Sequence, residues 1–353
     1  GNEEKENPRM TSTTAVLDSI DSTLAGEVPE VTASAASVRQ MRRYEPRVIP
    51  GTANRRLPWA GLVTGSADDG ETLTSSELLA KAGLDWETGI RPLYRRMNDG
   101  TYRQHDRARE TYNKRSEVSL GEVKSHYEPY NNVDVFAFGD FIAEQGQGRW
   151  ISAGQQVKGR RVFMTMLLRE FTVLGGDLHS LYLFLRASHD GSTGLNAWII
   201  PFRVECTNQQ AMVDATHQGH VRILHTQNIS ERIEEAKATM SSAADYSVEF
   251  TSIVEKLAAA PVTDRRVKDI IARLVPEGRS RRDTMIADIR HVYQTSPTVE
   301  PYRGTAYGIL NAVTEYYGHV KPTSNSNALF ESIMRGEGAK ARSRVLRDLA
   351  GLN

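Results

Sequence analysis

The stretch LYLFLRASHDGSTGLNAWIIPFRVEC, residues 181–206, decides the fold. Two apolar runs, residues 181–188 and 195–206, flank the polar segment HDGSTG. An Asp-Gly pair between two such runs is a strong hairpin signal, because glycine adopts positive φ without steric cost. The stretch therefore predicts two antiparallel strands joined by a tight turn.

More strands are expected before this hairpin. Residues 149–153 and 160–169 have strand character and are joined through VKG, whereas residues 133–141 show the spacing of a helix. A further strand is expected from about residue 120 to the break at Pro129, so the resulting order is a strand, a helix and then four consecutive strands. It predicts an α+β fold, in which a curved antiparallel sheet carries a packed helix on one face.

The chain divides into three predicted parts. Residues 1–55 are rich in Ser, Thr, Ala, Glu and Pro, which is typical of a mobile arm. Residues 56–226 form the expected α+β core, with a short helix over 75–82, a strand over 87–94, and a loop or exposed hairpin over 97–116. From residue 227 the apolar spacing becomes helical, so residues 227–353 are predicted to be an all-helical domain.

Composition limits the classes of function. The 353 residues include 44 basic and 44 acidic side chains, so binding to nucleic acid or to an anionic membrane would need a local basic patch. The single cysteine excludes an intrachain disulfide and favours the cytoplasm. No apolar run approaches the roughly 18–20 residues of a spanning helix, and no membrane association is expected. Since Gly1 is not a usual start, we expect Met10 to be the native start.

The sequence predicts no metal, nucleotide or other cofactor. Its nine histidines are scattered without an H-E-x-x-H motif, and neither a phosphate-binding P-loop nor a dinucleotide fingerprint after a strand occurs.

The turn of the central hairpin contains the residue types of a nucleophilic hydrolase. Ser188, His189, Asp190 and Ser192 lie within five positions. However, side chains that are neighbours in sequence rarely meet in the geometry of a catalytic triad, and no G-x-S-x-G elbow is present. Turn chemistry explains these residues, and a hydrolase that uses the turn stays an alternative.

One face of the predicted sheet is aliphatic, whereas the other mixes arginines with aromatic rings. The period of two places Arg161, Phe163 and Arg169 on the mixed face, together with Tyr182 and Arg186 of the next strand. Such a face can follow a phosphate backbone and stack bases, or its rings can pack against helices. No catalytic residue is expected. The candidate nucleic-acid-binding residues are Arg149, Trp150, Lys158, Arg160, Arg161, Phe163, Arg169, Tyr182, Arg186, His189, Trp198 and Arg203.

Several motifs resemble a known family. HDGST (189–193), PFRVECTNQQAM (201–212), ILHTQNISERIEEA (223–236) and GTAYGILNAVTEYYGH (304–319) are similar to the phage/plasmid-like domain of unknown function 932. The resemblance covers residues from about 75 to 320. Gln209 and Gln210 stand where the family often has Thr-Leu, and Tyr307 stands where tryptophan is common. The family implies phages, plasmids and related mobile elements, and its name states no function.

The expected order of elements also resembles the core of the RecT/Redβ/Erf group of single-strand annealing proteins. That resemblance implies a phage-encoded DNA-binding protein of the host-cell cytoplasm, which anneals single-stranded DNA without ATP as a homo-oligomeric ring or filament. Expected partners are single-stranded DNA and a phage exonuclease or a host recombination or replication protein. The alternatives are a non-enzymatic interaction or assembly protein of a phage and the hydrolase described above.

Overall fold

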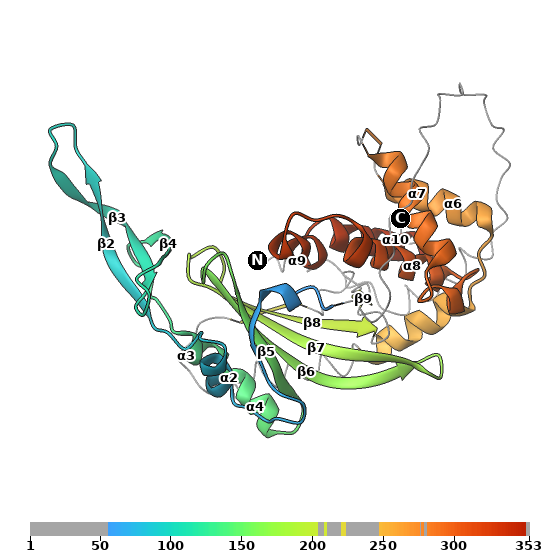
Figure 1. Ribbon diagram of the computed structural model, residues 1–353, viewed down its shortest axis with the longest axis horizontal. Coiled ribbons are helices and arrows are strands. Elements are labelled where there is room, and N and C mark those ends of the chain that lie inside the picture. Colours follow the sequence, from blue (N-terminus) through green and yellow to red (C-terminus); the bar gives the residue numbers. More distant parts are fainter. Residues whose placement is uncertain are drawn as a thin grey trace, which may run out of the picture.

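The computed structural model describes residues 56–203, 208–209, 220–223, 247–275, 277–278 and 281–350. Figure 1 shows a large sheet, a smaller sheet that projects from one end, and a helical C-terminal region. The predicted arm over residues 1–55 lies outside the described residues. The boundary predicted at 226/227 and the first residues of the predicted helical domain lie outside them as well.

The larger sheet is antiparallel and contains seven strands among the described residues, in the order β1-β5-β6-β7-β8-β10, with β9 paired to β8. The consecutive neighbours β5 to β8 confirm the predicted run of strands, and Gly191 in the β7–β8 turn has φ +70°. The strands are β1 (Val63–Ser66), β5 (Arg149–Gln156), β6 (Arg161–Val173), β7 (Asp177–Ser188), β8 (Leu195–Arg203), β9 (Asn208–Gln209) and β10 (His220–Ile223).

The smaller sheet has the order β2-β3-β4. Its strands are β2 (Thr88–Arg96), β3 (Tyr102–Asn113) and β4 (Ser119–Lys124). The hairpin of β2 and β3, called the β2–β3 ribbon below, extends away from the rest of the molecule (Figure 1). An exposed hairpin, one of the two alternatives for residues 97–116, is therefore confirmed. Its turn contains Gly100 at φ +85°, and the Asp99 carboxylate accepts a hydrogen bond from the Thr101 backbone N–H at 2.9 Å.

Three short helices pack beside the larger sheet: α2 (Ser75–Lys81), α3 (Asn132–Phe136) and α4 (Phe138–Glu144). α2 confirms the short helix expected over 75–82, and it begins at a capping box of Thr74 and Glu77. The single helix expected over 133–141 is instead split at Ala137. The Asn131 side chain does not cap α3, because its amide oxygen accepts a hydrogen bond from the Thr88 backbone N–H at 3.1 Å.

The C-terminal region is helical, as predicted. Thr263 and Asn325 cap two of its helices, each accepting a hydrogen bond from a backbone N–H of the first turn. The described elements are a helix over residues 247–259, α6 (Asp264–Leu274), α7 (Arg282–Thr295), the 3-10 helix η4 (Glu300–Tyr302), α8 (Ala306–Glu315), the π-helix η5 (Tyr316–Val320), α9 (Ser326–Met334) and α10 (Glu337–Ala350).

Both faces of the larger sheet are covered. The aliphatic face, including Met164 and Leu183, joins one apolar cluster with α2 to α4 and the C-terminal helices. The mixed face packs under Trp59, which precedes the 3-10 helix η2 (Ala60–Leu62), and under Phe330 of α9. Every residue of β8 is consequently buried. Figure 1 shows α9 on one side of the sheet and α2 to α4 on the other.

Candidate nucleic-acid interface

The aromatic rings of the mixed face form a core in this structure. Phe163 stacks on Phe184 with ring centroids 5.1 Å apart, and Phe330 lies 5.1 Å from Phe184 and 6.4 Å from Phe163. Trp198 is also buried, and the partly buried Tyr182 contacts Trp59 edge-on at 5.8 Å. Of the two interpretations of this face, packing against a helix is the one observed. Phe163, Tyr182 and Trp198 do not form the stacking surface predicted for them.

Trp150 and Arg203 are also held inside the protein. Trp150 is buried on the aliphatic side of the sheet, where its indole N–H donates to Asp140 Oδ1 at 2.7 Å. Arg203 is 1% exposed, and its Nε donates to Asp177 Oδ1 at 2.6 Å while Nη1 donates to the Thr298 carbonyl at 2.6 Å. Because burial keeps both side chains from the surface, neither is placed to contact a strand of nucleic acid.

His189 lies inside the protein and connects several elements. Its ring is fully buried between Trp86 and Tyr130, with centroid distances of 5.0 Å to each. Nε2 lies 2.8 Å from Asn132 Oδ1, and Nδ1 lies 3.2 Å from Thr88 Oγ1. Both ring nitrogens are therefore occupied by polar groups of other elements.

The catalytic arrangement that a hydrolase needs does not form at this turn. The Ser188 hydroxyl donates to Asp190 Oδ1 at 2.7 Å and lies 3.2 Å from Ser192 Oγ. The neighbouring imidazole, His189, is bonded to Asn132 and Thr88 instead, so no serine is activated by a histidine here. The polar contacts stabilise the hairpin turn.

Four predicted basic residues lie exposed along the sheet. Lys158 and Arg160 belong to the β5–β6 turn, where Lys158 adopts φ +56°. Arg149 and Arg169 lie farther along the strands, opposite Leu167 and Leu181 respectively. The structure therefore brings Lys158 and Arg160 together with Arg161 at the β5–β6 turn, and leaves Arg149 and Arg169 apart from them.

A cluster of three arginines surrounds one carboxylate where α9 meets the sheet. Glu331 Oε1 lies 3.1 Å from Arg186 Nη1 and 3.8 Å from Arg161 Nη1, and Glu331 Oε2 lies 2.8 Å from Arg335 Nη2. The buried Gln156 amide lies 3.4 Å from both Arg186 and Glu331. We call Arg161, Arg186, Arg335 and Glu331 the Glu331 cluster. Desolvation lowers the pKa of Arg186 to about 10, and repulsion by Arg335 and Arg161 adds to this shift while Glu331 opposes it.

An exposed basic surface lies on the β2–β3 ribbon, whose residues are not among the predicted site residues. Tyr94 and Tyr102 are 59% and 68% exposed on it. A signal in the sequence was available, because arginines and two tyrosines alternate around an Asn-Asp-Gly turn. The exposed arginines of the ribbon are Arg95, Arg96, Arg103, Arg107 and Arg109. Within the described part of the chain none of them forms an ion pair, whereas Arg91 near the ribbon base binds Glu110 at 2.5 Å.

The strand register orders these side chains at the ribbon tip. Arg95 lies directly opposite Arg103, and Arg96 lies opposite Tyr102. Because residues paired across strands share a face, Arg95 and Arg103 form a like-charged pair on one face, and Tyr94, Arg96 and Tyr102 lie on the other. The tip thus presents cations on both faces and aromatic rings on one.

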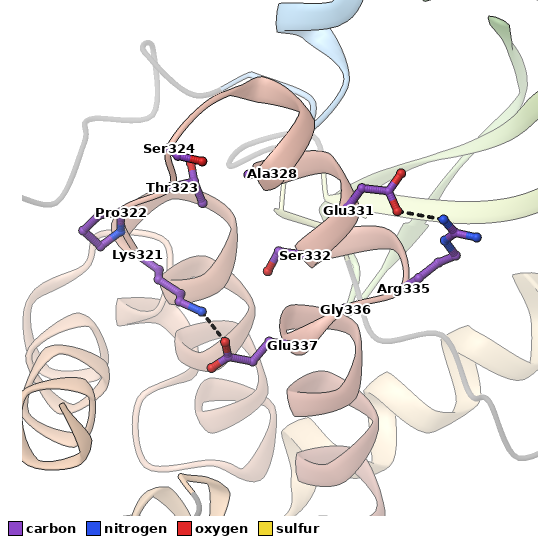
Figure 2. Close-up of a pocket in the computed structure, with 10 residues that line it drawn as sticks. All are labelled: Lys321, Pro322, Thr323, Ser324, Ala328, Glu331, Ser332, Arg335, Gly336 and Glu337. Atoms are coloured by element: carbon purple, nitrogen blue, oxygen red, sulfur yellow. Dashed lines mark hydrogen bonds and ion pairs between the residues drawn. The ribbon is translucent and has the colours of Figure 1, made fainter. Parts of the chain in front are cut away.

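An open pocket of about 590 Å³ lies between α9 and the start of α10. Figure 2 shows its two ion pairs, Lys321–Glu337 and Arg335–Glu331, on opposite sides of Ser332. Both cations already have a carboxylate partner at 2.5 and 2.8 Å. The described residues contain no group of His, Cys, Asp and Glu side chains suited to a metal ion. Within the same ranges no helix combines the length and apolar character needed to cross a membrane.

Comparison with known proteins identifies one family. The family described as Domain of unknown function (DUF932) matches residues 119–345, which is more than half of the chain. The match begins at β4 and extends through α9 into α10, farther than the motifs that end at residue 319. No curated protein and no solved structure matches the chain. The chain therefore belongs to the DUF932 family.

Proposed function

We propose that this protein binds single-stranded DNA through the β2–β3 ribbon. The observation that carries the proposal is the set of exposed arginines on a projecting hairpin without acidic partners among the described residues. Guanidinium groups bind phosphate oxygens through paired N–H donors, and a projecting ribbon can reach a strand without rearrangement of the core.

The pairing of Arg95 with Arg103 supports an external anion. Like charges directly opposite each other destabilise an antiparallel pair, so this register lowers the stability of the isolated ribbon. A phosphate backbone lying along that face would remove the repulsion. Near the ribbon base, by contrast, Arg91 lies opposite Glu110, and this carboxylate of the chain itself balances its charge.

Tyr94 and Tyr102 favour a single strand over a duplex. Both rings are more than half exposed near the tip, although aromatic side chains usually bury most of their surface. Unpaired bases can stack on such rings regardless of sequence, whereas the bases of a duplex are already stacked. Lys158 and Arg160, exposed at the β5–β6 turn, extend the basic surface onto the main sheet.

On this basis the wider proposal is ATP-independent annealing by a homo-oligomer in the cytoplasm of a phage host. Arginines would neutralise the phosphates of two strands so that complementary bases can pair, with no covalent step. In this arrangement an oligomer would place several ribbons along one strand, which raises the effective concentration of binding sites.

The proposal is tested with the triple variant Arg95→Gln/Arg96→Gln/Arg103→Gln. Fluorescence anisotropy of a labelled oligonucleotide, measured over a range of salt concentrations, gives the affinity and its salt dependence. Each lost phosphate contact lowers the slope of log K against log salt by about 0.7 for a single strand, so the slope should fall by about 2.

The matched control is Arg265→Gln/Lys268→Gln/Arg347→Gln, which removes the same charge from exposed positions of the helical region. It is expected to keep the affinity and salt slope of the unaltered chain. Equal losses in both variants, or an unaltered chain whose binding is weak and insensitive to salt, would refute the ribbon as the interface. Strand-annealing assays without ATP then test the wider proposal separately.

A further inference from the structure

The Glu331 cluster contains more positive charge than its one carboxylate can balance. Arg161, Arg186 and Arg335 carry three charges against one on Glu331. The Asp190 carboxylate accepts a hydrogen bond from the Ser188 hydroxyl and lies within electrostatic reach of Arg161, but the two form no ion pair in the described structure. The cluster proper therefore retains an excess of two positive charges.

Arg186 is a buried cation whose hydrogen-bonding capacity is only partly used. Its side chain is 1% exposed, yet Nε and Nη2 have no hydrogen-bond partner within the described structure. Buried guanidinium groups are normally satisfied, because desolvated donors without acceptors destabilise the folded state. The rings of Trp198 and Phe330 lie 5.1 and 5.9 Å from the guanidinium carbon and stabilise the cation through their π faces. They supply no oxygen or nitrogen acceptor for Nε and Nη2.

The cluster can be reached from solvent. The side chains of Arg335, Glu331 and Arg161 are 43%, 34% and 25% exposed and lie above the buried Arg186. Figure 2 shows the Arg335–Glu331 pair at the edge of α9, away from Lys321 and Glu337. An anion can therefore approach Arg161 and Arg335 without disrupting the apolar core below.

We propose that the Glu331 cluster is an oxyanion-binding site that takes a phosphate group between Arg161 and Arg335, on the solvent side of Glu331. The excess of two charges matches a phosphate dianion, and the planar guanidinium groups present paired donors to its oxygens. The phosphate comes either from inorganic phosphate or from the 5′ end of a DNA strand. The site does not depend on the function proposed for the β2–β3 ribbon.

Inorganic phosphate is the first probe, titrated into the full chain by calorimetry and by thermal unfolding with chloride at matched ionic strength. The unaltered protein should bind phosphate and melt at a higher temperature in its presence. Arg335→Gln and Arg161→Gln should each weaken phosphate binding by roughly tenfold to a hundredfold, the loss of one charge-assisted contact. Arg265→Gln, an exposed change on α6, is the control and should bind as the unaltered chain does.

Glu331→Gln separates an anion site from a purely structural ion pair. Removing the carboxylate leaves three uncompensated guanidinium groups, so this variant should melt at a lower temperature in chloride and bind phosphate more tightly. Phosphate should restore much of its lost melting temperature. A structural ion pair alone would give a destabilised variant that phosphate does not rescue, and this result would overturn the proposal.

Oligonucleotides with a 5′-phosphate or a 5′-hydroxyl identify the source of the phosphate. Tighter binding of the phosphorylated strand, lost in Arg335→Gln, indicates a DNA end, whereas equal binding with retained inorganic phosphate affinity indicates free phosphate. The ribbon triple variant should keep its phosphate affinity in either case. Absence of both phosphate binding and a 5′-phosphate preference would overturn the site without bearing on the ribbon.

Discussion

The arginines of the β2–β3 ribbon and those of the main sheet lie on strands in both cases but in opposite surroundings. Arg186 and Arg203 are buried, and each is paired with a carboxylate from a distant part of the chain or from the next strand. Arg95 and Arg103 extend into solvent opposite each other. The first pair stabilises the junction between the sheet and the helical region, whereas the second leaves its charge available to a partner.

This difference shows that a count of arginines is a poor guide to a nucleic-acid interface. A buried guanidinium without a counter-charge costs several kcal/mol, so the fold supplies Asp177 to Arg203 and Glu331 to Arg186. A solvated guanidinium has no such requirement. The positions of the carboxylates, more than those of the arginines, therefore separate the two regions.

The largest expected effect on the free energy of unfolding comes from replacing one buried arginine of the main sheet, compared with one exposed arginine of the ribbon. Arg203→Met leaves the Asp177 carboxylate buried without its charge partner and should lower the free energy of unfolding by about 3–5 kcal/mol. Arg103→Met, at the exposed ribbon tip, should change it by no more than about 0.5 kcal/mol. Urea denaturation of both variants measures the difference.

Removing both partners of the buried pair serves as the control. Arg203→Met/Asp177→Leu no longer contains an unpaired buried charge, so it should recover much of the stability that the single variant loses. A double variant as unstable as the single one would mean that the pair acts through shape and not through charge. Equal stability of Arg203→Met and Arg103→Met would remove the distinction between the two regions.

A smaller effect is expected from the tyrosines, again in one region only. Tyr94→Ala/Tyr102→Ala should weaken binding of a single-stranded oligonucleotide by about 1–3 kcal/mol for each base that stacks on a ring. The slope of affinity against salt should stay unchanged, because no cation is removed. Anisotropy titrations at several salt concentrations test both statements, and Tyr94→Phe/Tyr102→Phe should bind almost normally. A loss of salt dependence in the alanine variant would contradict stacking.

Local patterns in the sequence predict the elements of the sheet well. The Asp-Gly turn and the period of two place β7 and β8 correctly, and helical spacing predicts the helical character of the C-terminal region. The aliphatic face was also predictable, because alternation fixes which side chains share a face.

What covers the mixed face was not predictable from those patterns. Gln156 and Glu331 are 175 positions apart in sequence but lie 3.4 Å from each other, and alternation in β6 contains no information about α9. Strand periodicity gives the faces of a sheet and leaves open whether a helix or a ligand occupies each. The ribbon was overlooked for a related reason: its polar residues give no apolar face, so the pattern allowed a loop or a hairpin equally.

The smallest effect concerns a buried histidine of the main sheet. His179 of β7 is fully buried beside Phe171 and Phe250, and desolvation lowers its pKa below the ordinary value of 6.5. The unfolded chain therefore binds a proton more readily than the folded chain. Above pH 6.5 the histidine is neutral in both states, and the free energy of unfolding does not depend on its titration. Below pH 6.5 the unfolded chain takes up the proton first, so the free energy of unfolding falls by at most about 1.4 kcal/mol per pH unit until the pH reaches the lower pKa of the folded state.

His179→Gln should make the decline in unfolding free energy between pH 7 and pH 5 shallower, whatever its effect on stability at neutral pH. Lowered carboxylate pKa values, such as that of Glu331, act at more acidic pH because their ordinary value is 4.5. The control is Arg103→Gln, an exposed change on the ribbon that leaves every histidine in place, and it should keep the pH profile of the unaltered chain. If His179→Gln had the same profile as the unaltered chain, proton uptake by His179 would not contribute to acid unfolding.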